Sequence, residues 1–445
     1  MKKADILIIG GSAGGLTAAI SAGRNYPTKK ITLIRREKEV LIPCSIPYIF
    51  ETIGSVKKNL IPDAVLSKNK VELIVDEVTK LSPVEKTVET AKGEEIRYQK
   101  LILATGSSPL VPPIEGIDLK NVFGVKKDVP YLRKVHKVLR GARGIVIIGG
   151  GFIGVEFADE LRRKEKRVTI IEMLPHCLQL AYDEEFCLEA EKVLESKGVV
   201  LRTGILAKKI GGKGKAKYVE LKNGEKIPTE VVILGIGVRP EVGLAQAAGL
   251  KLGKTKAIKV DEYQRTSNGD IFAVGDCAEK FSFFTGKPSP LRLASIAARE
   301  ARIAGANLFR AKEKNEGTIG TFATIVGDLA LGVAGLTENA AKEAKIEVVK
   351  GEASTVCRHP GAMPGSRPVF VKLLFTRKGQ LVGGQAYGDS AIGEVVNIIA
   401  ALIQGRAQVE EVVEFQVGTH PALTPSPIVY PIVTAAEVAK THLKS

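Results

Sequence analysis

Two glycine-rich segments, 139 residues apart from Gly10 to Gly149, constrain the fold of this chain more than any other feature. Each lies between a short apolar run and a run with helical periodicity, and a second apolar run follows. A glycine-rich turn between a buried strand and a helix is typical of a parallel βαβ unit, so we predict two such units. The strand, turn, helix and second strand cover residues 5–9, 10–15, 16–23 and 31–34 in the first copy, and 144–148, 149–154, 155–164 and 168–172 in the second.

The second copy carries the complete G-x-G-x-x-G pattern. The first glycine permits the turn, the second lets the backbone approach a pyrophosphate, and the third lets the helix pack on the strand, while the helix N-terminus faces the phosphate charge. Glu172 ends the next strand, where a carboxylate can accept from both ribose hydroxyls and would repel a 2′-phosphate. NADH is therefore favoured over NADPH. The predicted contacts are Gly149, Gly151, Phe152, Ile153, Gly154 and Glu172.

The first copy departs from that pattern at two positions. Ser12 stands where the middle glycine is expected, and Arg35 occupies the place of the acidic ribose ligand. Glu37, two residues further on, offers a replacement carboxylate. The predicted contacts of the first copy with its own dinucleotide are Gly10, Ser12, Ala13, Gly14, Gly15, Arg35 and Glu37.

Length and charge limit the class of protein. The 445 residues exceed one ordinary hydrophobic core, so we expect two or three domains. The net charge of +16 is dispersed along the chain and has no aromatic stacking platform beside it, so we do not expect nucleic-acid binding. It suits either a lysine-rich solvated surface or attraction to polyanions such as dinucleotides and coenzyme A. No apolar run reaches the length of a transmembrane helix, so we expect no membrane span.

The five cysteines form neither a metal-binding pair nor a disulfide framework. We therefore predict no metal site and a reducing, cytoplasmic location. After about residue 326 the pattern changes to strand-like runs followed by an apolar helix, which indicates a separate α+β domain. The strand-like runs cover 346–353, 369–376 and 379–388, and the helix covers 394–403.

Three further segments complete a resemblance to a known family. Ala104-Thr105-Gly106 and Gly235-Ile236-Gly237 each follow an apolar strand-like run, and TSNGDIFAVGD ends at Asp276. With the two glycine-rich turns, and in the same order, these motifs resemble the pyridine nucleotide-disulfide oxidoreductase family over essentially the whole chain. The resemblance implies a flavoprotein enzyme that uses FAD and NAD(P)H, in which Asp276 holds the flavin ribitol. It adds Ala104, Thr105, Gly106, Gly235, Gly237, Gly275 and Asp276 to the predicted cofactor contacts.

The resemblance also implies the domain organisation. It places an FAD-binding domain at residues 1–112 and 245–325, an NAD(P)H-binding domain at 113–244 and a dimerisation domain at 326–445. The expected fold class is therefore α/β, with two Rossmann-like dinucleotide-binding domains and a C-terminal α+β dimerisation domain.

Cys44, in the sequence LIPCSIPY, occupies the place of the family's redox cysteine. Members with a dithiol carry a second cysteine five positions later, where this chain has Ile49. The chain thus resembles the single-cysteine branch of coenzyme A disulfide reductases, persulfide or polysulfide reductases, and NADH oxidases and peroxidases. In that branch the cysteine lies at a helix N-terminus against the flavin as a thiolate, and reacts with an external partner.

Two departures from the branch bear on the substrate. Oxidases and peroxidases carry a histidine where this chain has Ala13, which disfavours dedicated oxygen or peroxide reduction. Coenzyme A disulfide reductases carry tyrosines where residues 361–365 have none, which disfavours coenzyme A disulfide as the sole substrate. We expect an NADH-dependent reductase of a small disulfide, persulfide or polysulfide, with coenzyme A persulfide first among the candidates. An NADH oxidase, a reductase of a carrier protein such as rubredoxin, and a non-catalytic redox sensor are the alternatives.

The segment THPALTP at 419–425 resembles the HPT segment of glutathione reductase and dihydrolipoamide dehydrogenase. In those enzymes the histidine comes from the other subunit and is the general acid and base. The resemblance implies a homodimer and a catalytic role for His420. Because Ala422 replaces the threonine and Pro425 replaces a glutamate, a solvent-facing His420 without a catalytic role is the alternative, and His359 is a second candidate.

Overall fold

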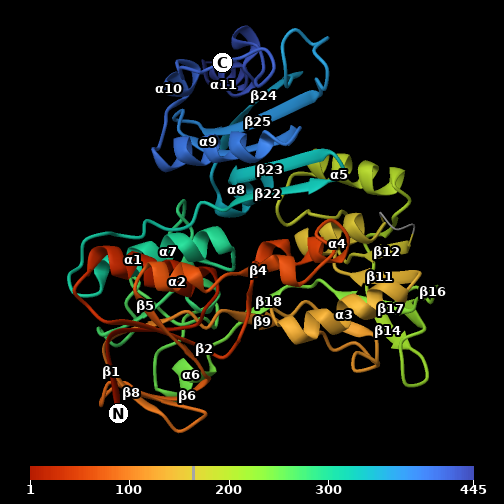
Figure 1. Cartoon of the computed structure of the whole chain (residues 1–445). Helices are drawn as coiled ribbons and strands as arrows, with labels where there is room; N and C mark the ends of the chain where they lie inside the picture. Colours follow the sequence, from red (N-terminus) through yellow and green to blue (C-terminus); the bar gives the residue numbers. More distant parts are fainter. Residues whose placement is uncertain (163–165, 445) are drawn as a thin grey trace. The chain divides into compact units, whose positions relative to one another are not determined.

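The computed structural model describes residues 1–162 and 166–444 (Figure 1). The chain folds into two compact units. The first unit contains residues 1–112, 124–141 and 237–318, and the second unit contains residues 113–123, 142–236 and 319 onward. Arg163 and Lys164, at the end of the predicted helix 155–164, lie outside the described residues.

A seven-stranded sheet forms the core of the first unit. Its order is β5-β2-β1-β8-β7-β6, and β19 pairs with β8. The strands β5, β2, β1, β8 and β19 run parallel. All five residues of β2 are buried, as expected of a parallel strand covered on both faces. The bounds are β1 Lys2–Ile9, β2 Ile31–Arg35, β5 Val71–Val75, β6 Val78–Ser82, β7 Thr87–Thr90, β8 Glu95–Leu103 and β19 Ile271–Ala273.

Helices α1 (Ala13–Asn25) and α7 (Ala294–Asn307) pack against each other in the first unit (Figure 1). A Cβ added to Gly305 would lie 2.6 Å from Ser21 Oγ, so the absence of a side chain permits this close contact. The unit also contains β3 Val40–Leu41, β4 Leu60–Ile61, α2 Ala64–Lys68, β9 Ser107–Pro109, α3 Val129–Gly141, β18 Val238–Pro240, α6 Gly243–Ala247, β20 Lys280–Phe281 and β21 Pro288–Ser289.

The second unit begins with a five-stranded sheet of order β10-β17-β11-β12-β13. Helix α4 (Phe152–Arg162) follows the second glycine-rich turn, between the parallel strands β11 and β12. The bounds are β10 Val122–Gly124, β11 Gly144–Ile148, β12 Arg167–Ile171, α5 Glu184–Ser196, β13 Val200–Arg202 and β17 Val231–Leu234. A small antiparallel sheet accompanies it, made of β14 Ala207–Gly211, β15 Tyr218–Leu221 and β16 Lys226–Pro228.

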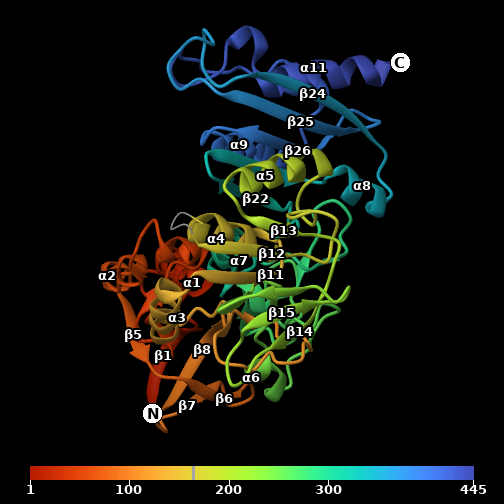
Figure 2. The ribbon, with the colours of Figure 1, turned by 90° about the vertical axis from the view of Figure 1, so that its right-hand side faces the viewer.

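The C-terminal part of the second unit is an antiparallel sheet of order β22-β23-β26-β25-β24. Helix α11 (Pro431–Lys444) lies along β24 and β25, and α9 (Ile392–Gln404) packs on β23 and β26 (Figure 2). The predicted change to an α+β pattern is confirmed. The bounds are β22 Thr321–Val326, β23 Leu329–Gly335, α8 Glu338–Ala344, β24 Val348–Val356, β25 Pro368–Thr376, β26 Leu381–Gly388, α10 Val409–Val413 and the 3-10 helix η5 Pro427–Val429.

Lys372 of β25 joins this C-terminal sheet to helix α5. Its side chain is fully buried, and its Nζ lies 2.7 Å from Asp183 Oδ2 and 2.9 Å from Glu338 Oε1, and also contacts Glu185. Burial alone would lower the pKa of Lys372, but these carboxylates outweigh it and raise the pKa. Asp183 also accepts from Gln385 of β26. Within residues 1–162 and 166–444, every helix is too short or too polar to traverse a lipid bilayer.

Candidate cofactor and redox sites

The two glycine-rich turns have the same backbone geometry. Gly10 has φ +115° and Gly149 has φ +108°. A Cβ on Gly10 would lie 2.2 Å from the carbonyl oxygen of Ala104, and one on Gly149 would lie 2.7 Å from that of Gly235. Both the positive φ and the close backbone exclude other residues at these positions. Ala104 and Gly235, two of the predicted contacts, thus lie beside the turns.

The third glycine of each pattern lets the helix approach the strand. A Cβ on Gly15 would lie 1.8 Å from Gly10 O, and one on Gly154 would lie 1.9 Å from Gly149 O. A Cβ on Gly151, by contrast, would meet no atom within 4 Å. The space in front of the second turn is therefore open, which fits the close approach of a pyrophosphate.

The helices that follow the turns keep their N-termini suited to an anion. Neither α1 nor α4 has an acidic residue in its first turn. Ser12 is the N-cap of α1, but its side chain makes no capping hydrogen bond. The first N–H groups of α1 are thus left without a side-chain acceptor there, as at helix ends that bind phosphate. These turns fit the pyrophosphates of FAD and NAD(P)H.

Glu172 braces the second turn. It is 9% exposed, and its carboxylate accepts from the backbone N–H of Gly150 at 2.5 Å and of Leu174 at 2.8 Å. An ionised carboxylate has about four acceptor positions, so two remain for ribose hydroxyls. These two hydrogen bonds fix the orientation of the side chain, and its contact with a ribose stays a prediction.

Arg35, at the equivalent strand end of the first copy, makes internal contacts instead. It is 3% exposed, donates to the carbonyl oxygens of Glu37 at 2.8 Å and Lys38 at 3.0 Å, and lies 2.7 Å from Asp63 Oδ1. Its Cδ would be 2.5 Å from a Cβ on Gly11, so its alkyl chain packs under the turn. Arg35 therefore supports the loop, and its contact with a dinucleotide stays a prediction. Glu37 accepts from Arg36, also at 2.7 Å.

Asp276 lies in the 3-10 helix η4 (Gly275–Cys277) of the first unit. Its carboxylate accepts from Ser107 Oγ at 2.6 Å and pairs with Lys127 Nζ at 3.3 Å. Burial acts to raise the pKa of Asp276, but Lys127 and Ser107 outweigh it, so the pKa is lowered and the group is an anion. An anionic acceptor suits the hydroxyls of a ribitol.

The predicted contacts Thr105 and Gly106, which follow β8, and Gly237, which precedes β18, lie close to each other in the first unit. Gly106 leads into β9, which pairs with β18, and Gly237 accepts from Leu110 N–H at 3.0 Å. Thr105 Oγ1 donates to the carbonyl oxygen of Glu241 at 2.7 Å. These contacts tie the two predicted segments together within the first unit.

A buried ion pair under Gly275 was not predicted from the sequence. Lys280 Nζ lies 3.1 Å from Glu300 Oε2, and both side chains are at most 2% exposed. Glu300 Oε2 also accepts from Gly275 N–H at 2.8 Å, and Lys280 donates to Gly275 O at 2.6 Å. The pair thus holds both backbone groups of Gly275, next to Asp276. In a sequence, this lysine and glutamate look like ordinary surface residues.

Glu156 of α4 is a second residue that the sequence did not single out. It accepts from Thr324 Oγ1 at 3.0 Å. Burial raises the pKa of Glu156 to about 7, although the hydrogen bond from Thr324 opposes the shift. Phe152, one turn earlier, stacks on Phe322 with ring centroids 5.4 Å apart. The first turn of α4 therefore packs on β22.

Cys44 is the exposed member of the five cysteines. It lies in the short 3-10 helix η1 (Pro43–Ser45), which is followed by η2 (Pro47–Phe50). The expected helix N-terminus at Cys44 is therefore only a three-residue 3-10 turn. Pro47 provides the reason, because its ring removes a backbone donor and disfavours a longer helix through this segment. Ile49, at the position of a second cysteine, is fully buried.

The other four cysteines are buried. Burial raises the thiol pKa of each, to about 12 for Cys187. Because the thiolate is the nucleophile, these four are poorly suited to disulfide exchange at neutral pH. The buried residues are Cys177, Cys187, Cys277 and Cys357.

His420 is exposed and belongs to a turn closed by its own backbone. Its N–H donates to Thr424 Oγ1 at 3.0 Å, and its Nδ1 accepts from Ala422 N–H at 3.2 Å, so the Ala422 bond occupies only one of the two ring nitrogens. His359 Nδ1 lies 3.0 Å from Thr424 O. The two candidate histidines thus share the Thr424 turn.

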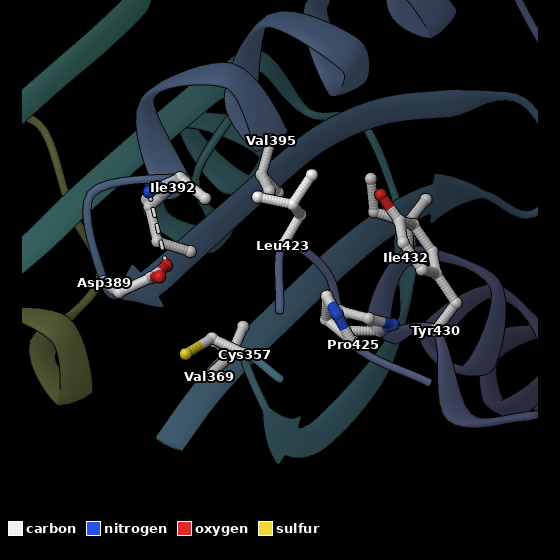
Figure 3. Close-up of a pocket in the computed structure, with 11 residues that line it drawn as sticks. Cys357, Val369, Asp389, Ile392, Val395, Leu423, Pro425, Tyr430 and Ile432 are labelled. Carbon is white, nitrogen blue, oxygen red and sulfur yellow. Dashed lines mark hydrogen bonds between the residues drawn. The ribbon is translucent and has the colours of Figure 1, made fainter. Parts of the chain in front are cut away.

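An apolar pocket lies beneath the segment that follows His420. Leu423 and Pro425 lie over it, with Cys357 and Asp389 on one side and Tyr430 and Ile432 on the other (Figure 3). Leu423 is 71% exposed. Val369, Ala391, Ile392, Val395 and Pro431 complete the lining.

Two phosphate-binding turns on separate parallel sheets, an anionic Asp276 and an exposed thiol define a dinucleotide-dependent oxidoreductase. Residues 4–301 match the family described as pyridine nucleotide-disulphide oxidoreductase, and residues 321–427 match its dimerisation domain. The chain belongs to the pyridine nucleotide-disulphide oxidoreductase family. It is an NAD(P)H-dependent flavoprotein oxidoreductase that uses FAD and acts on a small molecule.

Individual relatives carry several names. An NADH oxidase of Methanocaldococcus jannaschii is 31% identical over 99% of both chains. An NAD(P)H coenzyme A polysulfide/persulfide reductase of Pyrococcus horikoshii is 31% identical over 91% of this chain and 92% of its own. The solved structure of an NAD-dependent persulfide reductase from A. fulgidus matches with a TM-score of 0.92 and 29% identity, over 99% of this chain and 83% of its own.

Proposed function

We propose that this protein uses NADH to reduce a small disulfide, persulfide or polysulfide through Cys44. One observation carries the proposal: Cys44 alone of the five cysteines is exposed, and it lies in the same compact unit as the FAD-type turn and Asp276. The other four thiols are buried with raised pKa values. A thiol that attacks an external sulfur compound needs both access and a thiolate.

For this reaction the chain has to hold the cofactors, the substrate and the Cys44 thiolate in the right positions. The chemistry that bound FAD would supply is the acceptance of a hydride from NADH and the delivery of two electrons to a sulfur–sulfur bond. The Cys44 thiolate attacks one sulfur of the substrate RSSR′, so a Cys44–S–SR bond forms, the substrate S–S bond breaks and R′S⁻ leaves. Two electrons then break the mixed disulfide and restore the thiolate. The sum is NADH + H⁺ + RSSR′ → NAD⁺ + RSH + R′SH.

The names of the relatives support a coenzyme A persulfide or polysulfide as the substrate. The net charge of +16 also suits a polyanionic substrate. NADH oxidation by oxygen is the second candidate, because a relative with that name matches over 99% of the chain. Ala13 disfavours this second candidate, because oxidases and peroxidases of the family carry a histidine at that position.

The proposal includes several finer assignments. FAD would bind residues 1–112 and 245–325, NADH residues 113–244, and 326–445 would form the interface of a cytoplasmic homodimer. His420, whose Nε2 is not occupied by the Ala422 bond, would be the general acid and base contributed across that interface. The match of the dimerisation domain supports the homodimer. A monomer by sedimentation equilibrium at micromolar concentration would exclude both the dimer and this role of His420.

The deciding experiment measures NADH consumption against coenzyme A persulfide, polysulfide, coenzyme A disulfide and oxygen. Cys44→Ser should keep FAD and still reduce ferricyanide, but should lose disulfide and persulfide reduction by a factor on the order of 10³ or more. Cys357→Ala is the matched control and should keep all activities. Full sulfur reduction by Cys44→Ser would contradict the proposal and favour electron transfer from the flavin alone.

A further inference from the structure

We infer that Asn59 is the positioning residue of the Cys44 thiol, fixing the turn from both sides of the cysteine. This inference rests on the proposed role of Cys44. Asn59 is fifteen residues further along the chain, at the end of the 3-10 helix η3 (Lys57–Asn59), and it is 1% exposed. Burying a polar amide is unfavourable unless its groups are hydrogen-bonded, so its partners matter.

The backbone of Asn59 brings its side chain to the cysteine turn. Strands β3 and β4 pair antiparallel, with Leu41 opposite Leu60. The pairing continues one residue further, because Ile42 N–H donates to Asn59 O at 3.0 Å. Asn59 is therefore fixed directly across from the residue at which the Cys44 turn begins.

The side-chain amide then spans the turn. Asn59 Nδ2 donates to Ile42 O at 3.1 Å, while Asn59 Oδ1 accepts from Ser45 Oγ. Ser45 Oγ also approaches Ile42 O at 3.3 Å. One amide thus holds the residues two before and one after Cys44, and the cysteine between them is exposed.

An amide is the side chain that this geometry requires. The turn presents a carbonyl oxygen at Ile42 and a hydroxyl at Ser45, so the clamp needs one donor and one acceptor. A carboxylate would set oxygen against the Ile42 carbonyl. It would also add a negative charge near a thiol that must ionise, which disfavours the thiolate.

The test compares Asn59→Ala and Asn59→Asp with Asn69→Ala in the FAD-loaded protein. Asn69 is a matched control, because its Nδ2 bonds Val65 O at 2.7 Å in the same unit, at the end of α2. The first readout is NADH-dependent disulfide reduction beside ferricyanide reduction, which takes electrons without the thiol. The second is the pH profile of Cys44 alkylation by iodoacetamide, followed by peptide mass spectrometry.

We expect disulfide turnover to fall by about ten- to a hundredfold in Asn59→Ala, since misplacing a reacting group by about 1 Å has effects of that size. Ferricyanide reduction should stay within about twofold. In Asn59→Asp the alkylation midpoint should move to higher pH. Asn69→Ala should change none of these.

If Asn59→Ala does not fold, Ser45→Ala removes one arm of the clamp and should lower disulfide turnover by about threefold. Unchanged disulfide turnover and alkylation profiles in Asn59→Asp and Ser45→Ala would overturn the inference and leave Asn59 a purely structural residue. The proposed function fails separately. If Cys44→Ser keeps full sulfur reduction while the Asn59 variants shift the alkylation profile, Asn59 still positions the thiol, but the thiol does not carry the reaction.

Discussion

The first dinucleotide fold (β1, α1 and β2) and the second (β11, α4 and β12) reach one backbone geometry with different side chains. Both place a glycine with φ above +100° at the turn. Both also have a glycine at the third position of the pattern, where an added Cβ would lie less than 2 Å from a backbone oxygen. They differ at the strand end. Glu172 accepts from its own turn, whereas Arg35 binds two carbonyls and Asp63.

The comparison shows which positions the geometry dictates. The first and third glycines are fixed by sterics, since any side chain there would meet backbone atoms. The middle position and the strand end are not fixed in this way, since a Cβ on Gly151 would meet no atom and Arg35 and Glu172 have different partners, and both positions differ between the two folds. The first fold has an additional support, the buried Lys280–Glu300 pair under Gly275.

The largest expected effect comes from breaking that support. Lys280→Met leaves the buried Glu300 carboxylate without its cation, so we expect the free energy of unfolding to fall by about 4 kcal/mol. FAD should also dissociate more readily, because the Gly275 turn loses its donor. Urea denaturation followed by circular dichroism measures the first effect and flavin fluorescence the second. The double variant with Glu300→Leu should recover most of the stability, and an unaffected single variant would show that the pair is not a support.

The third glycines should respond alike in both folds. Gly15→Ala and Gly154→Ala each force a Cβ against a backbone oxygen, so each should lower the free energy of unfolding by about 3 kcal/mol. Gly151→Ala is the matched control, since the added Cβ would meet nothing, and it should keep stability while raising KM for NADH. Thermal denaturation of the three variants gives the comparison. A clear difference between Gly15→Ala and Gly154→Ala would break the equivalence of the two turns.

In the second fold, Glu156 should make the stability depend on pH. The pKa of Glu156 is raised from 4.5 to about 7, so the folded state favours the protonated carboxyl. Its contribution to stability is complete below pH 4.5 and is lost as the pH rises through about 7. The stability of Glu156→Gln relative to the parent should therefore increase by about 3 kcal/mol between those pH values. A difference independent of pH would contradict the shifted pKa.

The smallest effect concerns the choice between cofactors. Glu172→Ala should reduce the ratio of kcat/KM for NADH over NADPH by about tenfold, because the carboxylate no longer binds the ribose or repels a 2′-phosphate. Steady-state kinetics with both cofactors measures it. Glu37→Ala, in the first fold, should leave this ratio unchanged. Equal use of NADPH by the parent protein would refute the role given to Glu172.

The sequence predicted the elements better than it predicted their supports. Strands and helices of both folds lie where the apolar periodicity placed them, since that pattern reflects burial directly. At Cys44, where a helix N-terminus was expected, the structure has a short 3-10 turn, because the prolines disfavour a longer helix. Asn59 and Lys280 were missed because their roles depend on partners that only the tertiary fold supplies. The cofactor contacts, apart from their geometry, stay predictions.

The contacts of Lys372 limit how this chain can be divided into separate fragments. Its ammonium group, contributed by a C-terminal strand, compensates the charge of Asp183 at the start of α5. A nucleotide-binding fragment ending before residue 326 would remove this cation and the Gln385 amide together. The fragment would then carry an exposed cluster of carboxylates on a surface shaped for burial. Transplanting such a fragment into another scaffold therefore calls for neutral residues at Asp183 and Glu185.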